Sequence, residues 1–523
     1  MNRLTGLDGI SLHGETEVMP THVLAVVFFD PAARGELTAR ALLRQLAERA
    51  TAIPSFRQRL LTRPFGLGQP AWIEDPAFDV RDHLHHVRLP EPGTMAELST
   101  LIGDFHAQPL DRRRPLWDAW VVQGLADGRL VGVIKFSHAM ADGVGAVTSL
   151  LPELMTADPD AEFAPAPPRP PATTPGVAAR VWDAIDEITA NTAAGLHVTA
   201  RLAPAAVKSA VESALGSARQ LLADTEPQPA DTPEPEQDQS SPRTVLNAPL
   251  TARRSVAFAE VPMEDLRAIS TAFGVTVNDA FLTVTTSALR RWLDTHDAVP
   301  SSPLRAMMPI STRSADDDAC NSWSPAVVSL PAQLADATEQ MAGIHAATSR
   351  IKNGRRSAPP VNLADVIDLV PPGVIRLASS VYSSLKLSRL HPPVAHLITS
   401  NVPGPRDTVY CAGAQVLGIH AMAPLVEGTN LNVTAVSYGE TFAVGIVACP
   451  DNVEDVAGVA RGIEDVVGEL RISADEKTGR GADVASASQL DRAVALTAAA
   501  QFAPHSMNGR SEQTGTPGTK QPA

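Results

Sequence analysis

The feature that most constrains this chain is a strand-like run that leads directly into a seven-residue turn, SHAMADG (Ser137–Gly143). The run itself is LVGVIKF (Leu130–Phe136), and its Val, Ile and Phe residues favour a buried strand. The residues that follow, as far as Leu151, read as the beginning of a helix. His138 is therefore expected at a strand end, where Gly143 tolerates the positive φ of a sharp turn.

A histidine at such a strand end is a candidate general base, because an imidazole takes up and returns a proton near neutral pH. Asp142 lies four residues further on and either fixes the turn through backbone or basic partners or orients the imidazole. We expect the structural role, since a side chain four residues away across a sharp turn points away from the ring. The turn is thus a candidate active site, with His138 as its base and Asp142 and Gly143 as its support.

Composition narrows the class of protein. A length of 523 residues exceeds what one hydrophobic core holds, which predicts two or three domains. The net charge of −15 argues against a nucleic-acid binder, because no basic face remains to neutralise phosphates. The three cysteines are not close in sequence, and their pattern offers no disulfide framework and no CxxC metal site. Without an apolar leader, or an apolar run near the ~20 residues that cross a bilayer, we expect a cytoplasmic protein, with membrane-surface contact left open.

The pattern of strands and helices predicts an α/β fold in two globular segments. Residues 1–157 carry the turn, and residues 243–473 form the second segment of mixed strands and helices. Between them, 158–242 contain a Pro-rich linker, helices and an acidic stretch that we expect to be disordered, and 474–523 read as a disordered tail. The apolar spacing within 177–223 indicates amphipathic helices, which either pack on a domain or touch lipid.

A histidine cluster in the first segment invites a metal-site interpretation. His83, His85 and His86 lie together in DVRDHLHHVRL. We interpret them as part of a strand with alternating histidines, because no carboxylate–histidine spacing of a known metal site accompanies them.

The HxxxDG turn resembles the HHxxxDG signature of the bacterial wax ester synthase/diacylglycerol acyltransferase family. The resemblance covers roughly residues 3–472, and it is specific because several further motifs follow in the family's order. These are LDG with PTHV (Leu7–Gly9, Pro20–Val23), PLW (Pro115–Trp117), VNDA (Val277–Ala280), MPISTR (Met308–Arg313) followed by Asn321, SNVPGP (Ser400–Pro405) and GTNLNVTAVSY (Gly428–Tyr438).

The resemblance implies two chloramphenicol-acetyltransferase-like domains with an active-site tunnel at their interface. His138 matches the family's catalytic histidine, Asp142 its aspartate and Gly143 its glycine. The first histidine of the family's pair is Ser137 here. That position either shapes the acceptor pocket or supports the turn, so its replacement bears on rate and acceptor preference.

The implied activity is O-acyl transfer from acyl-CoA to diacylglycerol, giving triacylglycerol, or to a fatty alcohol, giving wax ester. Direct transfer needs no resident cofactor, metal or covalent nucleophile, and the chain has no GxSxG elbow. Because the substrates are lipids, peripheral attachment to the inner membrane face or to lipid droplets is expected. The alternatives are a catalytically silent lipid-binding homologue, or an acyltransferase with another acceptor or a carrier-protein donor.

The donors that would stabilise a tetrahedral oxyanion are less well defined. Candidates for substrate or oxyanion contacts are Ser137 itself and, from the second segment, Asn278, Thr399, Ser400 and Asn401.

Three of the motifs also have simple structural interpretations. PLW is expected to serve packing. SNVPGP reads as a rigid turn because of its Pro and Gly residues, with a place in the active-site wall between the domains as the alternative. In VNDA, Asn278 or Asp279 either caps a helix or lines the tunnel.

Overall fold

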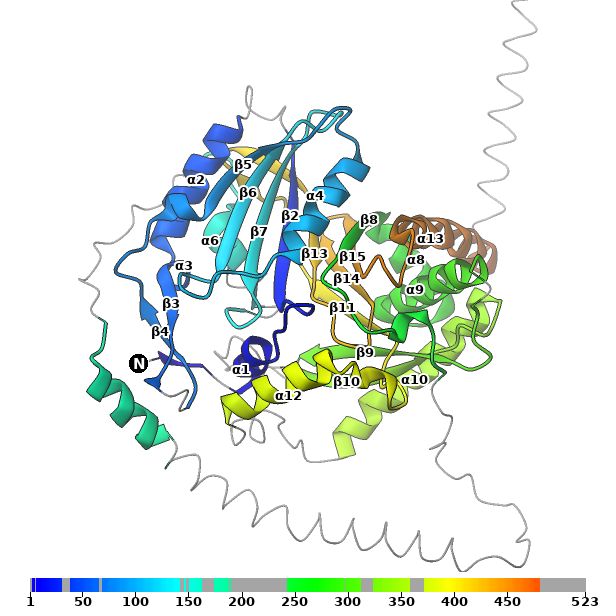
Figure 1. Cartoon of the computed structure of the whole chain (residues 1–523). Helices are drawn as coiled ribbons and strands as arrows, with labels where there is room; N and C mark the ends of the chain where they lie inside the picture. Colours follow the sequence, from blue (N-terminus) through cyan, green and yellow to red (C-terminus); the bar gives the residue numbers. More distant parts are fainter. Residues whose placement is uncertain are drawn as a thin grey trace, which may run out of the picture. The chain divides into compact units, whose positions relative to one another are not determined.

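The computed structural model describes residues 2–4, 6–30, 38–64, 68–141, 145–146, 150–161, 174–187, 189, 242–296, 298–311, 323–357 and 371–479. Met1–Arg471 form one compact unit, and Ile472–Ala523 form a second. The first unit combines strands and helices, as predicted (Figure 1). The division of the chain at residues 157, 242 and 473 stays a prediction.

The first six-stranded sheet carries the candidate turn. Its strand order is β12-β13-β2-β7-β6-β5. β2 and β7 pair antiparallel along their whole length, from His22 opposite Ser137 to Phe29 opposite Leu130, so the predicted strand at Leu130–Phe136 is confirmed. The bounds of its strands are β2 (His22–Phe29), β5 (Leu84–Arg88), β6 (Trp117–Gln123), β7 (Leu130–Ser137), β12 (Tyr410–Cys411) and β13 (Ala414–Met422).

The second six-stranded sheet has the order β10-β9-β11-β14-β15-β8, and a small third sheet has the order β1-β4-β3. The bounds are β8 (Ser255–Pro262), β9 (Leu304–Ser311), β10 (Trp323–Leu330), β11 (Leu397–Pro403), β14 (Leu431–Tyr438) and β15 (Thr441–Ala448), then β1 (Asn2–Arg3), β3 (Gln58–Leu61) and β4 (Ala71–Glu74).

The interpretation of SNVPGP as a rigid turn is wrong for its first four residues. Ser400–Pro403 complete β11, which pairs in parallel with β14 and sets Ser400 opposite Thr434. The preceding Leu, Ile and Thr residues favour a strand, and the proline stands at the strand's last position. The chain leaves the sheet at Gly404, where an added Cβ would collide with the Ser437 carbonyl oxygen.

Helices cover both sheets. α4 packs on β8, so a helix of the first segment lies on the second segment's sheet (Figure 1). α13 runs to Thr478, past residue 474 where we expect the tail to begin. The bounds are α1 (Gly6–His13), α2 (Ala39–Ala52), α3 (Pro54–Arg57), α4 (Met95–Ala107), α6 (Leu151–Leu154), α8 (Met263–Phe273), α9 (Val277–Asp294), α10 (Ala337–Ser357), α12 (Pro372–Ser384) and α13 (Val456–Thr478).

The PLW motif has the packing role that the sequence predicts. Trp117 is fully buried between two rings, with its centroid 4.8 Å from that of Phe56 and 4.5 Å from that of His83. Its indole Nε1 donates a hydrogen bond to the Phe56 carbonyl at 2.7 Å. The stack joins β6 to the segments on either side of it.

We expect Trp117→Ala to lower the free energy of unfolding by about 3–5 kcal/mol, because it leaves a large cavity in this stack. Urea denaturation followed by circular dichroism measures the change. Trp182→Ala is the matched control, since Trp182 is 72% exposed and its removal should leave the midpoint unchanged. Equal midpoints for the two variants would contradict a packing role for Trp117.

Candidate active site

A cavity of about 660 Å³ lies between the two six-stranded sheets. The first sheet contributes residues of β2, β7 and β13, and the second contributes residues of β9, β11 and β14. Further lining residues come from α1, α6 and α12, from Phe56 on α3 and from the loop at 423–426. Most of the lining is apolar, with side chains such as Val23, Ile134, Phe136, Met307, Ile398, Val402, Ile419 and Val436.

His138 lines this cavity from the end of β7. It is half-buried, and its backbone N–H donates to the Thr21 carbonyl at 3.1 Å. The turn is closed by the Met140 N–H, which donates to the Ser137 carbonyl at 2.9 Å. The strand end therefore presents an imidazole to an apolar cavity, as the sequence predicts for a general base. Asp142 and Gly143, the expected supports of the turn, lie outside the described residues.

Ser137 lies on the other face of β7. Side chains alternate along a strand, so Phe136 and His138 face the main cavity while Ser137 faces away. Its hydroxyl accepts a hydrogen bond from the Ala139 N–H at 3.3 Å. The neighbouring cavity, bordered by His22, measures about 10 Å³, roughly room for one water. Of its two expected roles, this placement favours support of the turn.

Behind the turn end of the β2–β7 pair, a few polar side chains are buried next to an apolar cluster. Lys135 Nζ donates to the carbonyls of Phe105 and Gln108 at 3.0 and 2.8 Å, and burial lowers the pKa of Lys135 to about 8. Burial likewise lowers the pKa of His106 to about 3 and that of His22 well below its usual value. These two histidines are therefore neutral at pH 7, and these polar side chains anchor the strands on the face away from the cavity.

The oxyanion candidates do not all reach the cavity. Ser400 and Asn401 line it, whereas Thr399 is buried outside the lining. Asn278 also lies outside the lining, in the first turn of α9, with its amide nitrogen 3.7 Å from the Met308 sulfur. Within the described part of the chain, no other residue forms a hydrogen bond with the Ser400 hydroxyl. The structure thus brings Ser400 and Asn401, but not Thr399 or Asn278, into one cavity with His138.

Two further polar side chains in the cavity, Asn432 and Thr434, were not among the site residues predicted from the sequence. Thr434 on β14 donates to the Asn432 side-chain oxygen at 2.8 Å, and Asn432 donates to the Pro424 carbonyl at 2.9 Å. Both belong to the GTNLNVTAVSY motif, which resembles the family's closing strand. The alternation of polar and apolar residues in LNVTAV was the available signal. The hydrogen bond between their side chains fixes the part of the cavity wall next to Ser400, which pairs with Thr434 across the sheet.

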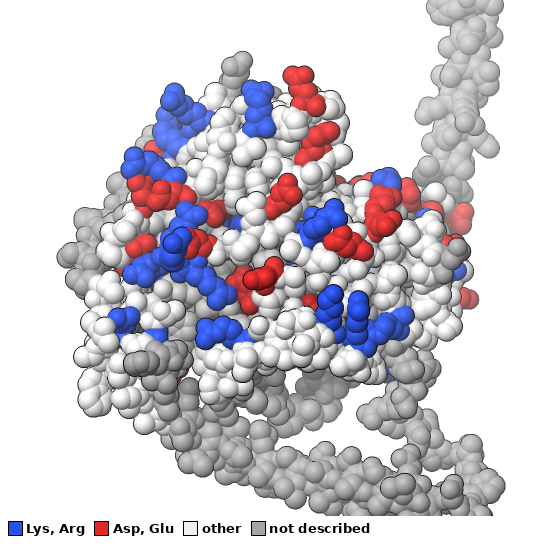
Figure 2. All heavy atoms as spheres, in the orientation of Figure 1, with Lys and Arg blue, Asp and Glu red and all other residues white. Residues whose placement is uncertain are grey.

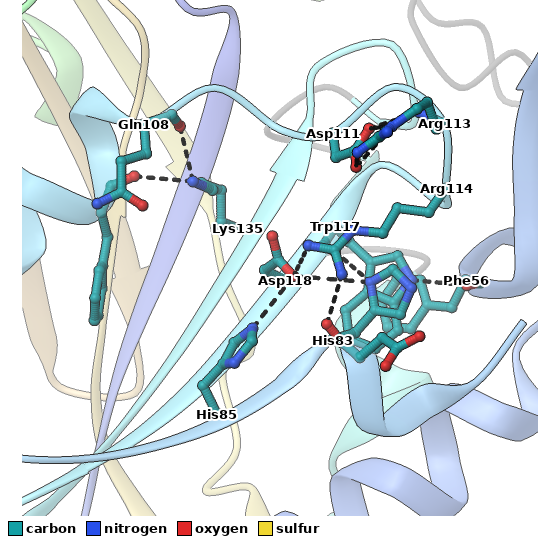
Figure 3. A network of polar contacts seen from close by, with 12 residues as sticks. Phe56, His83, His85, Gln108, Asp111, Arg113, Arg114, Trp117, Asp118 and Lys135 are labelled. Carbon is teal, nitrogen blue, oxygen red and sulfur yellow. Dashed lines mark hydrogen bonds and ion pairs between the residues drawn. The ribbon is translucent and has the colours of Figure 1, made fainter.

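Two of the three clustered histidines, His83 and His85, belong to a structural network (Figure 3). His85 and His86 are on β5, as expected, and His83 precedes the strand. His83 Nδ1 lies 2.7 Å from the Trp117 carbonyl oxygen, and His85 Nε2 lies 3.4 Å from the Asp118 carboxylate. Among the described residues, no group of three or more His, Cys, Asp or Glu is placed to hold a metal ion.

The helix at residues 177–187 attaches through its acidic side chains. Arg63 Nη2 donates to Asp183 at 2.6 Å and also pairs with Glu187, while Arg3 pairs with Asp183 at 2.8 Å. Trp182 on the same helix remains exposed. Apart from residue 189, the rest of 188–223 lies outside the described residues, so lipid contact by this segment stays a prediction. No helix in the described part of the chain is long and apolar enough to cross a membrane.

Comparison with known proteins identifies the family. A family model described as the wax ester synthase/diacylglycerol acyltransferase catalytic domain matches residues 4–281, and one described as the C-terminal domain of the same family matches residues 320–471. A relative from Mycobacterium tuberculosis with the provisional name diacylglycerol O-acyltransferase is 32% identical over 480 residues, 91% of each chain. Another from that organism, tgs1, with the same provisional name, is 31% identical and covers 90% of this chain and 96% of its own.

A solved structure shows the same fold. The wax ester synthase/diacylglycerol acyltransferase from Marinobacter aquaeolei VT8 superposes with a TM-score of 0.63 at 24% identity, covering 91% of this chain and 100% of the other. The chain therefore belongs to the wax ester synthase/diacylglycerol acyltransferase family. The predicted family, enzyme class and fold of two chloramphenicol-acetyltransferase-like domains are confirmed.

The VNDA motif forms the buried N-terminal cap of helix α9. Thr276 and Asp279 form a capping box at the beginning of α9, and Asp279 is fully buried. Its carboxylate accepts a hydrogen bond from the Thr348 hydroxyl at 2.7 Å and lies 2.9 Å from His345 Nδ1. Burial alone would raise the pKa of the Asp279 carboxyl, but the hydrogen bonds from His345, Thr276 and Thr348 outweigh it and lower that pKa.

Asp279→Asn should destabilise the protein by about 1.5–3 kcal/mol at pH 7, because hydrogen bonds to a charged group are lost. A carboxyl with a lowered pKa stabilises the fold above its unfolded value of about 3.9, and this contribution disappears as the pH falls through the folded value. The thermal midpoints of wild type and variant should therefore converge below about pH 4. The control is Asp104→Asn, on the exposed face of α4; a gap independent of pH would contradict an ionised Asp279.

Proposed function

We propose that this protein transfers a long-chain acyl group from acyl-CoA to the hydroxyl of diacylglycerol or of a fatty alcohol, with His138 as the general base. Membership of the family supports the reaction class, and the names of the relatives support the diacylglycerol acceptor. The observation that carries the proposal is the half-buried imidazole of His138 in an apolar cavity of about 660 Å³.

In the proposed reaction, His138 removes the proton of the acceptor hydroxyl as its oxygen attacks the thioester carbonyl. A carbon–oxygen bond forms, the tetrahedral oxyanion collapses, and the carbon–sulfur bond breaks. The protonated imidazole then returns its proton to the departing thiolate, so free CoA and an ester are the products. Apolar walls support this reaction, because water in the cavity would hydrolyse acyl-CoA instead.

Direct transfer agrees with the state of the described cysteines. Cys411 and Cys449 are buried, and burial raises the pKa of the Cys411 thiol to about 12. Such a thiol supplies almost no thiolate at neutral pH, so it is a poor nucleophile. Neither cysteine lines the cavity with His138.

We further propose that Ser400, with Asn401 beside it, donates to the oxyanion. Ser400 lies in the cavity wall on β11, and no other described residue forms a hydrogen bond with its hydroxyl.

Acyl-CoA and the acceptor are the expected partners. Because both carry long apolar chains, we propose that the enzyme works attached to a lipid surface.

His138→Ala should lower kcat for acyl transfer by about 10²–10⁴-fold, the usual value of a positioned acid–base group. The assay supplies long-chain acyl-CoA with diacylglycerol or a fatty alcohol to the full chain in detergent micelles, and follows ester and free CoA. His86→Ala is the matched control, because His86 is exposed on β5 and should be dispensable. Wild-type rates in His138→Ala would exclude the base. A folded wild type without transfer to either acceptor would favour a silent lipid-binding protein or another acceptor or donor.

Ser400→Ala should reduce kcat by about 10²-fold with little change in KM, because an oxyanion donor acts in the transition state. Thr399→Ser is the neighbouring control, outside the lining of the cavity, and should retain the wild-type rate. A rise in KM at constant kcat for Ser400→Ala would assign Ser400 to substrate binding instead.

A further inference from the structure

Helix α12 has two unlike faces, and one of them borders the cavity. Ile375 and Ser379 line the cavity, and α12 packs against α1, whose Ile10 and Ser11 line it too. The helix begins with Pro372 at its first turn, where the fixed φ of proline is favourable. α12 is therefore part of the wall between the cavity and the outside of the molecule.

The opposite face of α12 is apolar and exposed. Val374, Leu377, Val381 and Leu385 follow one another at spacings of three and four residues, which places them on one stripe. Leu377 and Leu385 are each 66% exposed. The apolar surface continues after the helix with Leu390, which is 79% exposed, and with Val394. These residues, 374–394, are called the α12 patch below.

The charges within the patch have one sign, and the half-buried carboxylate of Glu427 lies beside it, accepting a hydrogen bond from the Ser388 hydroxyl at 3.3 Å. Residues 371–394 contain Arg376, Lys386 and Arg389 but no Asp or Glu, although the whole chain carries a net charge of −15. All three cations are exposed, and none forms an ion pair with another described residue. In Figure 2, Lys and Arg side chains lie among uncharged surface in the lower part of the view, where α12 runs in Figure 1.

The segment after the helix is held in place. Arg243 donates to the carbonyls of Ser388 and His391 at 2.9 and 2.6 Å, and the Tyr382 hydroxyl lies 2.6 Å from His391 Nε2. Leu385, Lys386 and Leu390 are thus presented on a fixed support. An exposed apolar stripe flanked by cations is the pattern of a helix that lies in the plane of an anionic lipid interface.

We propose that the α12 patch docks this protein on the surface of an anionic phospholipid bilayer. The apolar stripe enters the boundary between headgroups and acyl chains, and the three cations contact lipid phosphates. The cavity-lining face of the same helix then lies directly behind the bilayer surface. The proposal rests on the proposed function in one respect, since a lipid acceptor gives the docked position its use.

The experiment measures sedimentation of the full chain with vesicles of phosphatidylglycerol and phosphatidylcholine in equal parts. Leu377→Gln with Leu385→Gln should weaken binding by about ten-fold for each leucine, because each loses its burial in the interface. Arg376→Gln, Lys386→Gln and Arg389→Gln should each weaken it about five-fold. Vesicles of phosphatidylcholine alone should not distinguish these charge variants from wild type.

The control removes two exposed apolar side chains elsewhere. Trp182→Gln with Ile185→Gln, on the helix at 177–187, should bind vesicles as wild type does. Absence of wild-type binding, full binding by the Leu377/Leu385 variant, or loss of binding only in the Trp182/Ile185 variant would each overturn the proposal. The proposal would also be overturned if the Leu377/Leu385 substitutions converted a dimer to a monomer and left vesicle binding intact. The patch would then be a contact between two copies of this chain.

A parallel acyl-transfer assay in detergent micelles separates the two proposals. The Leu377/Leu385 variant should keep the wild-type rate there within about two-fold, since neither side chain lines the cavity. Vesicle binding through α12 without any acyl transfer would leave docking intact and overturn the proposed function. Acyl transfer in micelles without vesicle binding would leave the proposed function intact and overturn the proposed docking.

Discussion

The pairing of β13 with β2 is the interaction on which the rest of the structure depends. It joins the first strand of the first sheet to a strand encoded near the end of the compact unit, with Leu24 opposite Met422. β13 also packs on β14 and β15 of the second sheet. One strand therefore belongs to the first sheet by its hydrogen bonds, contacts the second by its side chains and lines the cavity between them.

Local patterns in the sequence predicted the strand that carries the candidate turn. β7 extends the expected strand by one residue, and its run is rich in the Val, Ile and Phe residues that favour a buried strand. β13 escaped because pairing between distant segments has no local signature. The SNVPGP motif was misinterpreted because its Pro and Gly residues mark the end of a strand rather than a separate turn.

The candidate site, like the fold, could be predicted only in part from the sequence. His138 could be singled out because a strand end, a turn and a histidine coincide within a few residues, and the resemblance to a family then assigned its role. Sequence order alone did not separate Ser400 and Asn401 from Thr399 and Asn278. For Ser400 and Thr399 that distinction depends on which face of β11 meets the cavity, and for Asn278 it depends on the side of the second sheet against which α9 packs. The two faces of β7 also have different roles. One face carries the His138 imidazole, and the other carries Lys135 with the buried polar side chains around it.

The distance in sequence between β2 and β13 has a consequence for biosynthesis. At a translation rate of about 5–20 residues per second, β13 leaves the ribosome about 20–80 s after β2. Throughout that interval β2 has an open edge of unpaired backbone groups and apolar side chains, which is a template for wrong pairing with other nascent chains. Chaperones that bind exposed strands would shield this edge until β13 is available to pair with β2.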